Sequence, residues 1–296
     1  MVGKGASANT FLVKAKDQSK STPNSGGFAW KVMTENKESE ESAIILKKEW
    51  DILNILSLHP NVIQCYEVLE NVAVEFETNS EFVNCCILEY ASNGSLHDFV
   101  KKCGRLPEDL VLFFFVQILS VIKYMHECNI VHLDIKPMNL LLDDWFNIKV
   151  WDFGTSEIMS VPNLLLSHRR GTQQFMAPEV SCFSRHTPYD PKPVDVYALA
   201  ITAVNLLRGE LDSPKIDTTN ESTVVNPRKH KRDLNQNIMD LDVSQELQEL
   251  ITSMLWSSPD MRPSVDEIWE HPWVQKGLSS INQPEIYSLI QTLNNW

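Results

Sequence analysis

The chain has 296 residues, 43% of them hydrophobic, which is enough for two lobes that each bury a core. Its formal net charge of -13 argues against general binding to nucleic acids or to anionic membranes. The N-terminus lacks the basic start and apolar core of a signal peptide, and no apolar run approaches the roughly 20 residues of a membrane span, so we expect an intracellular protein of the cytoplasm.

Six cysteines are spread along the chain, and none of them forms a Cys-x-x-Cys pair. No cluster of histidines completes a zinc site with them. We therefore expect free, buried thiols in a reducing compartment, and a redox or metal-binding role is the lesser alternative.

The first feature along the chain is a glycine-rich stretch at residues 3–8, in which Gly3 and Gly5 are followed by Ala8. Spaced glycines let a backbone approach phosphate groups and point its amides at them, and the spacing is similar to that of a Gly-x-Gly-x-x-Gly nucleotide loop. Ala8 replaces the third glycine and limits the backbone angles there. A flexible, glycine-rich terminus is the alternative.

A surface loop and a strand are expected next. Residues 14–27 are rich in Lys, Ser, Pro, Asn and Gly, which is typical of a loop. Residues 28–33, Phe-Ala-Trp-Lys-Val-Met, then read as a strand. Strand alternation places Ala29 and Lys31 on one face and Trp30 on the other.

An amphipathic helix is expected over residues 43–58, after a polar run at 34–42 that is typical of a solvated loop. The apolar stripe of this helix consists of Ile45, Ile52, Leu53 and Leu56. Glu49 on the same helix is the best partner for Lys31, in a partly buried ion pair in which each charge needs the other. A solvated Glu49 is the alternative.

Residues 85–91, Cys-Cys-Ile-Leu-Glu-Tyr-Ala, read as a buried strand. A helix is expected to begin at Pro107, because proline fits the first turn and the acids Glu108 and Asp109 complement the helix dipole. Apolar residues follow at helical spacing, which favours core packing over a cofactor site. They are Leu112, Phe115, Val116, Leu119 and Ile122.

Two short segments carry a dense set of polar residues. Residues 132–139 are His-Leu-Asp-Ile-Lys-Pro-Met-Asn, and residues 152–154 are Asp-Phe-Gly. Apolar runs at 140–142 and 148–151 predict two short strands that bring Asp152 to one pocket with Asp134, Lys136 and Asn139. Phosphoryl transfer from a nucleotide needs these groups: a carboxylate to orient a hydroxyl, a cation to neutralise the moving group, and an amide with a second carboxylate to hold magnesium. Ordinary loop acids are the alternative.

Further helices are expected in the C-terminal half. Asp195 begins a strongly apolar helix that extends to residue 208, and Gly209 can cap its end. Residues 210–240 are polar and include a basic run at 228–232, which we expect to be a solvated loop, with a docking or nucleic-acid patch as the alternative. Residues 244–255 have the spacing of an amphipathic helix.

The last part of the chain contains two helix signals. Ser264 and Glu267 predict a capping box that opens the final helix of the domain, which should end near Pro272. Residues 285–293 place their apolar side chains on one helical face, which we expect to dock back on the domain. That face consists of Ile286, Leu289, Ile290 and Leu293.

In order and spacing, these motifs resemble the eukaryotic protein kinase catalytic domain of the serine/threonine type, from about residue 3 to residue 273. The resemblance implies an α+β, two-lobed fold. It implies a small β-rich N-lobe with one main helix over about residues 1–90 and a larger, mostly helical C-lobe over about residues 91–273, before a tail at 274–296. It also implies transfer of the γ-phosphate of ATP to Ser or Thr hydroxyls of protein substrates with Mg²⁺, while the oligomeric state stays open.

The resemblance assigns roles in the transfer step. Asp134 would accept or orient the substrate hydroxyl, and Lys136 would balance charge on the transferring group. Thr172 in the segment 171–179, Gly-Thr-Gln-Gln-Phe-Met-Ala-Pro-Glu, would bridge these two residues. Asn139 and Asp152 would hold the Mg²⁺.

The resemblance also assigns an ATP pocket. Lys31, held by Glu49, would reach the phosphates, and the backbone of Glu89 and Ala91 would bond to adenine, with Leu88 at the back of the pocket. Ser95 takes a place where an acid often meets the ribose. The residues implied in ATP binding are Gly3, Gly5, Ala8, Ala29, Lys31, Glu49, Leu88, Glu89, Ala91, Ser95 and Leu141.

Three structural contacts are implied as well. Glu179 should form a salt bridge with Arg262, and Asp195 should hold the backbone of the loop that contains Asp134. His132 should pack against Phe153, since nothing near it in the sequence suggests metal ligation.

Two departures from the family pattern are informative. Leu133 stands where an arginine usually precedes the catalytic Asp, and that arginine normally pairs with a phosphorylated residue of the activation segment. We infer that activity does not depend on this phosphate clamp, even if Ser167 is phosphorylated. Trp151 is bulky at the floor of the nucleotide pocket and is expected to restrict ligands.

A pseudokinase, which binds nucleotide as a scaffold without useful catalysis, is the alternative function. The imperfect glycine loop, Leu133 and Trp151 support it, while the intact set of Lys31, Asp134, Lys136, Asn139 and Asp152 opposes it. A small-molecule kinase is disfavoured by residues 171–179, which suit a peptide groove.

Overall fold

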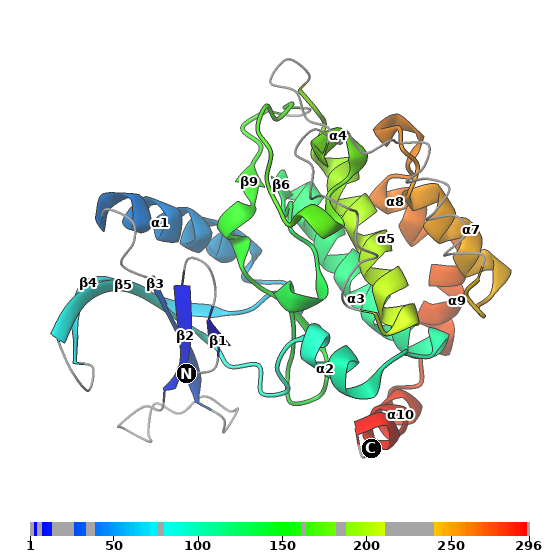
Figure 1. The fold of residues 1–296 in the computed structure, drawn as a ribbon, viewed down its shortest axis with the longest axis horizontal. Helices are drawn as coiled ribbons and strands as arrows, with labels where there is room; N and C mark the ends of the chain where they lie inside the picture. The colour runs from blue at the N-terminus through cyan, green and yellow to red at the C-terminus, as the bar shows by residue number, and fades with distance from the viewer. Residues whose placement is uncertain are drawn as a thin grey trace, which may run out of the picture.

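The computed structural model describes residues 3–4, 8–13, 27–33, 39–75, 80–161, 164–181, 188–210 and 240–294. The N-terminal lobe is an antiparallel five-stranded sheet in the order β1-β2-β3-β5-β4 (Figure 1). Its strands are β1 Gly3–Lys4, β2 Ala8–Val13, β3 Phe28–Met33, β4 Cys65–Glu75 and β5 Ser80–Glu89. The basic run at 228–232 lies outside the described residues.

The one described helix of the N-lobe, α1 Ser39–Leu56, lies against β4 and β5. Its buried side chains follow the expected helical stripe, because Ile52, Leu53 and Leu56 are all 3% exposed or less. The helix begins at Ser39, so the expectation of a loop up to residue 42 was wrong. The sequence Ser-Glu-Glu-Ser at 39–42 suits a first helical turn, since acids there complement the helix dipole.

The C-lobe is mostly helical, so the α+β, two-lobed arrangement expected from the sequence is confirmed (Figure 1). Its helices are α2 Leu96–Cys103, α3 Glu108–Glu127, α4 Pro178–Ser181, α5 Lys192–Arg208, α7 Gln245–Met254, α8 Val265–Trp269, α9 Pro272–Ser280 and α10 Gln283–Asn294. Short 3₁₀ turns lie at Pro137–Asn139, Phe153–Thr155, Gln173–Phe175 and Pro259–Met261.

Two small antiparallel pairs of strands flank the segment 132–139. The strand β7 Leu140–Leu142 pairs with β8 Ile148–Val150, as the two apolar runs predicted. The strand β6 Ile130–Val131 pairs with β9 Glu157–Ile158. Together these pairs fix both ends of the segment 132–139.

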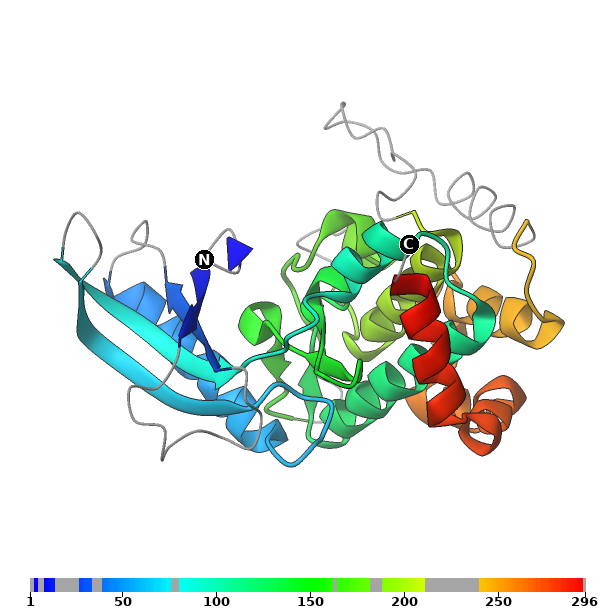
Figure 2. The ribbon, with the colours of Figure 1, turned by 90° about the horizontal axis from the view of Figure 1, so that it is seen from below.

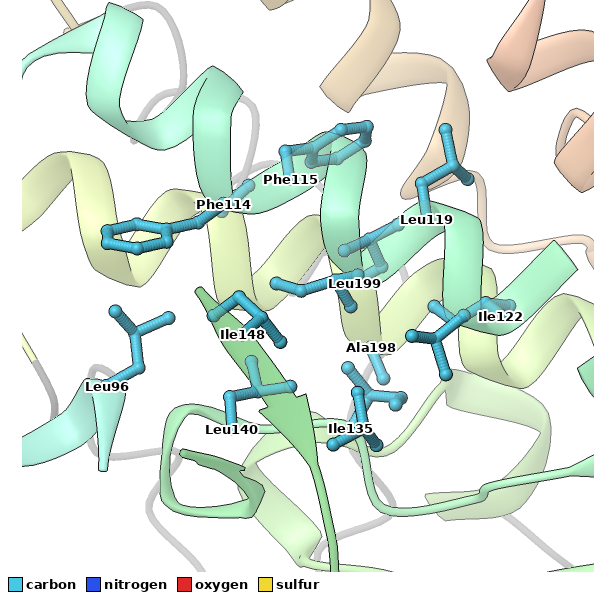
Figure 3. Packing of buried hydrophobic residues seen from close by; sticks show 14 of the residues in the cluster. Leu96, Phe114, Phe115, Leu119, Ile122, Ile135, Leu140, Ile148, Ala198 and Leu199 are labelled. Carbon is cyan, nitrogen blue, oxygen red and sulfur yellow. The ribbon is translucent and has the colours of Figure 1, made fainter. Parts of the chain in front are cut away.

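The core of the C-lobe is built on α3 and α5, which pack side by side. Figure 3 shows Phe114, Leu119 and Leu199 of these helices beside Leu140 and Ile148 of the small hairpin, all buried. By length and composition alone α3 is apolar enough to cross a membrane, but 72% of its apolar window is buried inside the protein. It is therefore the core helix that its spacing predicted.

The C-terminal end differs from expectation. The capping box of Ser264 and Glu267 opens α8, but a further helix, α9, starts at Pro272, so α8 is not the last helix of the packed body. Trp273 of α9 is 3% exposed and contacts the ring of Phe115 at 5.2 Å. A proline that ends one helix also fits the first turn of the next, which is why the sequence signal was ambiguous.

The tail helix α10 docks back on the C-lobe, as its apolar face predicted. Figure 2 shows it, in red, along the outside of α3 and near α2. Ile286 and Ile290 are buried, and the ring of Tyr287 lies 6.0 Å from that of Phe146.

Candidate active site

A buried lysine on β3 connects the sheet to α1 and to the C-lobe. Lys31 Nζ lies 2.7 Å and 2.9 Å from the two carboxylate oxygens of Glu49 and 3.0 Å from Asp152 Oδ1. The expected pair of Lys31 with Glu49 is thereby present, and both side chains are less than a tenth exposed. Opposite charges so shielded from water stabilise each other's ionised forms.

Lys31 and Asp152 shift each other's pKa. Burial by itself lowers the pKa of Lys31, but the carboxylates of Glu49 and Asp152 outweigh burial and raise that pKa above its ordinary value. Desolvation would raise the pKa of the Asp152 carboxyl, but the charge and hydrogen bond of Lys31 hold it below its ordinary value. At neutral pH the lysine is therefore a cation and the aspartate an anion.

Asp134 lies at the centre of a second polar group. Lys136 Nζ donates to Asp134 Oδ2 at 2.6 Å and to Thr172 Oγ1 at 2.6 Å. The backbone N–H of Thr172 donates to Asp134 Oδ1 at 2.8 Å, so Thr172 bridges the two residues as expected. Asn139 Nδ2 donates to the backbone oxygen of Asp134 at 2.8 Å and to its Oδ2 at 3.1 Å.

The loop around Asp134 is held from below by a buried carboxylate. Asp195, in the first turn of α5, is fully buried. Its Oδ1 accepts the N–H of Leu133 at 2.8 Å, and its Oδ2 accepts the N–H of His132 at 3.0 Å and lies 3.0 Å from His126 Nε2. Asp195 thus holds the loop backbone as predicted, and Leu133 keeps a left-handed φ of 66° there.

The segment 151–153 bends sharply into the pocket. Asp152 has a left-handed φ of 62°, which turns its side chain toward Lys31. The expected packing of His132 against Phe153 is present, with ring centroids 5.1 Å apart. Trp151 donates from its indole N–H to the backbone oxygen of Met138 at 3.1 Å, and its ring centroid is 5.3 Å from Lys31 Nζ.

The residues assigned to the adenine end come from strands of both lobes and from the segment between them. Ala29 on β3 is paired in register with Leu88 on β5, and both are buried. Ser95 forms a backbone bridge with Leu141 of β7, and Ala91, which lies between Leu88 and Ser95 in sequence, is buried. The assigned wall residues therefore come from paired positions on β3 and β5 and from the bridge to β7.

Two side chains near this wall are committed elsewhere. The Glu89 carboxylate lies 2.9 Å from Lys149 Nζ, and the Glu89 N–H donates to the Gln64 backbone oxygen at 2.8 Å, so both of these groups are committed. The Ser95 hydroxyl donates to Asp98 Oδ2 at 2.6 Å and caps α2 by accepting the N–H of Asp98. In the structure Ser95 is the N-cap of α2. The sequence analysis, which placed it where an acid often meets the ribose, did not predict this role.

The glycine-rich stretch is described only at its ends. Gly3 pairs with Thr10 across β1 and β2, so residues 3–4 and 8–13 form the hairpin that such a loop requires. Gly5 and the side chain of Ala8 lie outside the described residues. The assignment of this loop therefore stays a prediction.

A bidentate salt bridge fixes the end of the segment 171–179. Arg262 Nη1 and Nη2 each lie 2.7 Å from an oxygen of Glu179, as expected. The guanidinium also donates to the backbone oxygens of Pro193 at 2.9 Å and Trp256 at 2.8 Å. Its side chain is 0% exposed, so this is a buried charge in which each of the three guanidinium nitrogens donates a hydrogen bond.

Sequence reasoning missed two groups near this site. His126 lies in the last turn of α3 and meets Asp195 only because α3 packs on α5. Glu157 on β9 pairs with Lys48 of α1 and with Arg170. No sequence motif includes either residue. The only sequence feature that could have indicated them is a polar side chain within an apolar helix, for His126, or within a short strand, for Glu157.

The donors around Asp152 suit a hard divalent cation. Asp152 and Asn139 supply oxygen ligands, which Mg²⁺ prefers, and Mg²⁺ in nucleotide enzymes takes its other ligands from phosphates and water. Because the Asn139 amide nitrogen is committed to Asp134, its amide oxygen is the atom left to serve as a ligand. The residues present therefore fit a Mg²⁺ ion that arrives with a nucleotide.

Comparison with known proteins agrees with this geometry. The protein kinase domain family matches residues 1–274. The chain is 35% identical over 235 residues to the SNF1-related protein kinase catalytic subunit alpha KIN12 of Arabidopsis thaliana. The aligned region covers 79% of this chain and 43% of that protein. It is 30% identical over 243 residues to NUAK family SNF1-like kinase 1 of Homo sapiens. This aligned region covers 82% of this chain and 33% of that protein.

A third relative is the serine/threonine-protein kinase GIN4 of Saccharomyces cerevisiae, which is 32% identical over 231 residues, or 78% of this chain and 19% of that protein. The chain thus spans less than half the length of these curated relatives. The match to the family nevertheless extends over nearly the whole chain and over every motif described above. This chain belongs to the protein kinase domain family.

Proposed function

We propose that this chain transfers the γ-phosphate of ATP to Ser and Thr hydroxyls of protein substrates, with Mg²⁺. The observation that carries the proposal is that Lys31 bonds to Asp152 while Lys136 and Asn139 bond to Asp134. The N–H of Trp151, next to Asp152, donates to the Asn139 backbone oxygen at 3.2 Å and so ties the two groups together. The relatives named serine/threonine-protein kinases support the same reaction type. Substrates and partners of the whole protein are proposals too, since the chain spans only part of each relative.

The proposed transfer step follows from the charges. Asp134 is acceptor-only when ionised, so it can align a hydroxyl toward a phosphorus atom and take up its proton. Lys136, 2.6 Å from Asp134 Oδ2, is placed to neutralise negative charge on the group in transit. Lys31 would hold the nucleotide phosphates, with its ammonium oriented by Glu49. A bound Mg²⁺ would supply charge neutralisation on the phosphates.

Thr172 positions the two groups that are proposed to act on the substrate hydroxyl. Its side chain and backbone tie Lys136 and Asp134 together, which fixes the mutual position of the two groups before a substrate arrives. Such pre-organisation is the main means by which an enzyme of this kind lowers a phosphoryl-transfer barrier.

The test uses the full 296-residue chain, Mg²⁺-ATP and a generic Ser/Thr protein substrate. Asp134→Asn keeps the size of the side chain and removes the acceptor charge. We expect phosphate transfer to fall by roughly 10²–10⁴-fold, while a fluorescent ATP analogue still binds. Lys31→Met, which removes the phosphate contact, serves as the blank.

The alternative is a nucleotide-binding scaffold without useful catalysis. Leu133 and Trp151 depart from the family pattern, but all five residues whose loss is typical of pseudokinases are present and oppose this alternative. Nucleotide binding by the unaltered chain without transfer above the Lys31→Met blank would select the scaffold. Near-normal turnover in Asp134→Asn would overturn the role proposed for that residue.

A further inference from the structure

A single carboxylate on β9 faces basic groups from two other segments. Glu157 Oε2 lies 2.8 Å from Lys48 Nζ of α1, and Glu157 Oε1 lies 2.8 Å from Arg170 Nη2. His168 Nε2 lies 3.5 Å from the same Oε1. The Glu157 side chain is 18% exposed and its two cationic partners about a third, so water screens these pairs only in part.

The backbone around Glu157 is firmly attached to the loop of Asp134. Glu157 pairs with Val131 in the β6–β9 ladder, and the N–H of Met159 donates to Asn129 at 2.7 Å beyond it. Figure 1 shows β6 and β9 together between α1 and the helices of the C-lobe. Since β6 leads directly into His132, the Glu157 carboxylate is fixed relative to the catalytic loop.

Each partner of Glu157 is next to a part of the site. Lys48 directly precedes Glu49, which orients Lys31. Arg170 is two residues before Thr172, whose N–H donates to Asp134. One carboxylate therefore links the helix that positions the phosphate-binding lysine to the segment that positions the catalytic loop.

The departure from the family pattern at residue 133 leaves that position without a cation. In kinases that this chain resembles, the arginine at that place pairs with a phosphorylated residue of the activation segment. Here Leu133 is buried and cannot donate from its side chain. The cations Lys48 and Arg170 meet instead at an anion that belongs to the fold.

Hydrogen bonds of its own dock the same segment on the C-lobe. Leu166 and Tyr189 exchange two backbone hydrogen bonds, of 2.9 Å and 3.0 Å. The Tyr189 hydroxyl donates to the backbone oxygen of His168 at 2.9 Å. Burial raises the pKa of Tyr189 to about 12, so the hydroxyl keeps its proton and stays a donor throughout the neutral range.

We infer that Glu157 is a positioning residue that replaces activation-segment phosphorylation by clamping Lys48 and Arg170 with a permanent negative charge. The inference rests on the proposed kinase function. It deepens that function by naming the contact that keeps the chain in a competent arrangement. With this contact in place, the chain without activation-segment phosphorylation is the active form.

The first test is Glu157→Gln in the full chain, which keeps the side-chain shape and removes the charge. We expect kcat to fall by roughly tenfold, because a small displacement of the segment is enough to misalign the groups, while the affinity for an ATP analogue stays within about threefold. Glu210→Gln is the matched control, since Glu210 forms an exposed pair with Arg208 at the opposite end of α5. Phosphatase treatment of the unaltered chain should leave kcat unchanged.

A double-mutant cycle separates clamping from general damage. If Glu157 acts through Arg170, the double variant Glu157→Gln with Arg170→Gln should lose no more kcat than the worse single variant. The matching cycle with Lys48→Gln tests the α1 side of the contact. Additive losses, an unaffected kcat in Glu157→Gln, or loss of turnover on phosphatase treatment would each overturn the inference.

A structural readout keeps the test independent of catalysis. Amide hydrogen exchange over residues 164–172 should accelerate in Glu157→Gln and not in Glu210→Gln, whether or not the chain transfers phosphate. Absence of turnover in the unaltered chain with this acceleration would sink the proposed function but keep the clamp. Unchanged exchange with normal turnover would sink the clamp and keep the proposed function.

Discussion

The backbone N–H of Thr172 donates to Asp134 Oδ1 at 2.8 Å, although 38 residues separate the two in sequence. The same threonine accepts from Lys136 Nζ at 2.6 Å through its hydroxyl. Its backbone therefore anchors the segment and its side chain orients the lysine, so the two contacts can be separated by substitution.

We expect Thr172→Val to lower kcat by roughly tenfold, because the backbone bond to Asp134 remains while Lys136 loses a partner. Thr172→Ser keeps the hydroxyl and serves as the control, with kcat within about threefold of the unaltered chain. Steady-state kinetics with saturating Mg²⁺-ATP measure both. Equal kcat values for the Val and Ser variants would show that the hydroxyl contact has no part in turnover.

Gly171 is expected to tolerate no side chain. Its φ is +93°, and an added Cβ would lie 2.3 Å from the backbone oxygen of Leu133. Because that oxygen belongs to a loop held by Asp195, it has little room to give way, so Gly171→Ala should displace the segment and reduce kcat by at least about tenfold.

Gly104→Ala is the matched control for this prediction. Gly104 also has a positive φ, of +74°, but its Cβ would meet nothing within 4 Å. Its ψ of -143° lies in a region that essentially only glycine adopts, so the alanine should cost about 1–3 kcal/mol of stability through backbone conformation alone and leave kcat unchanged. Similar kcat values for the two alanine variants would show that the contact with Leu133 is unimportant.

The buried pair of Arg262 with Glu179 should contribute strongly to the unfolding free energy of the C-lobe. Glu179→Gln leaves a fully buried guanidinium without its counter-charge, and breaking such a pair costs about 3–5 kcal/mol of unfolding free energy. Urea unfolding followed by circular dichroism measures the change. Exposed Glu210→Gln should cost less than about 1 kcal/mol in the same assay, and a similar cost for both variants would contradict the argument.

The ionisation of Asp152 should depend on Lys31. The pKa of this carboxyl is held below its ordinary 3.8 because the charge and hydrogen bond of Lys31 outweigh desolvation. A folded-state pKa below the unfolded value means that this contact adds stability above the unfolded pKa. That contribution is lost as the pH falls through the lowered folded-state pKa.

In Lys31→Met the desolvation remains and the cation is gone, so the pKa of Asp152 should rise above its value in the unaltered chain. Carboxyl-carbon NMR titration of labelled aspartate measures this directly. Asp98, whose pKa is lowered by its hydrogen bonds to Ser95 and by His97, should titrate alike in both proteins. An unmoved Asp152 titration would contradict the assigned coupling.

The sequence predicted the elements whose signals are local. The alternation in residues 28–33 gave β3 and the face of Lys31, and the apolar spacing after Pro107 gave α3. Family motifs added the pairing of Glu179 with Arg262, which no periodicity implies. The start of α1 and the extra helix α9 were misjudged, since serine, acids and proline favour turns and helix starts alike.

The sequence by itself determined which chemistry is present, because carboxylate, ammonium and amide groups at fixed spacings have few other uses. Only the tertiary structure decided that His126 meets Asp195 and that Glu157 joins Lys48 to Arg170. Those contacts depend on how α1, α3, α5 and β9 pack against one another. The position of a packed element depends on side chains far along the chain, so no local pattern can encode it.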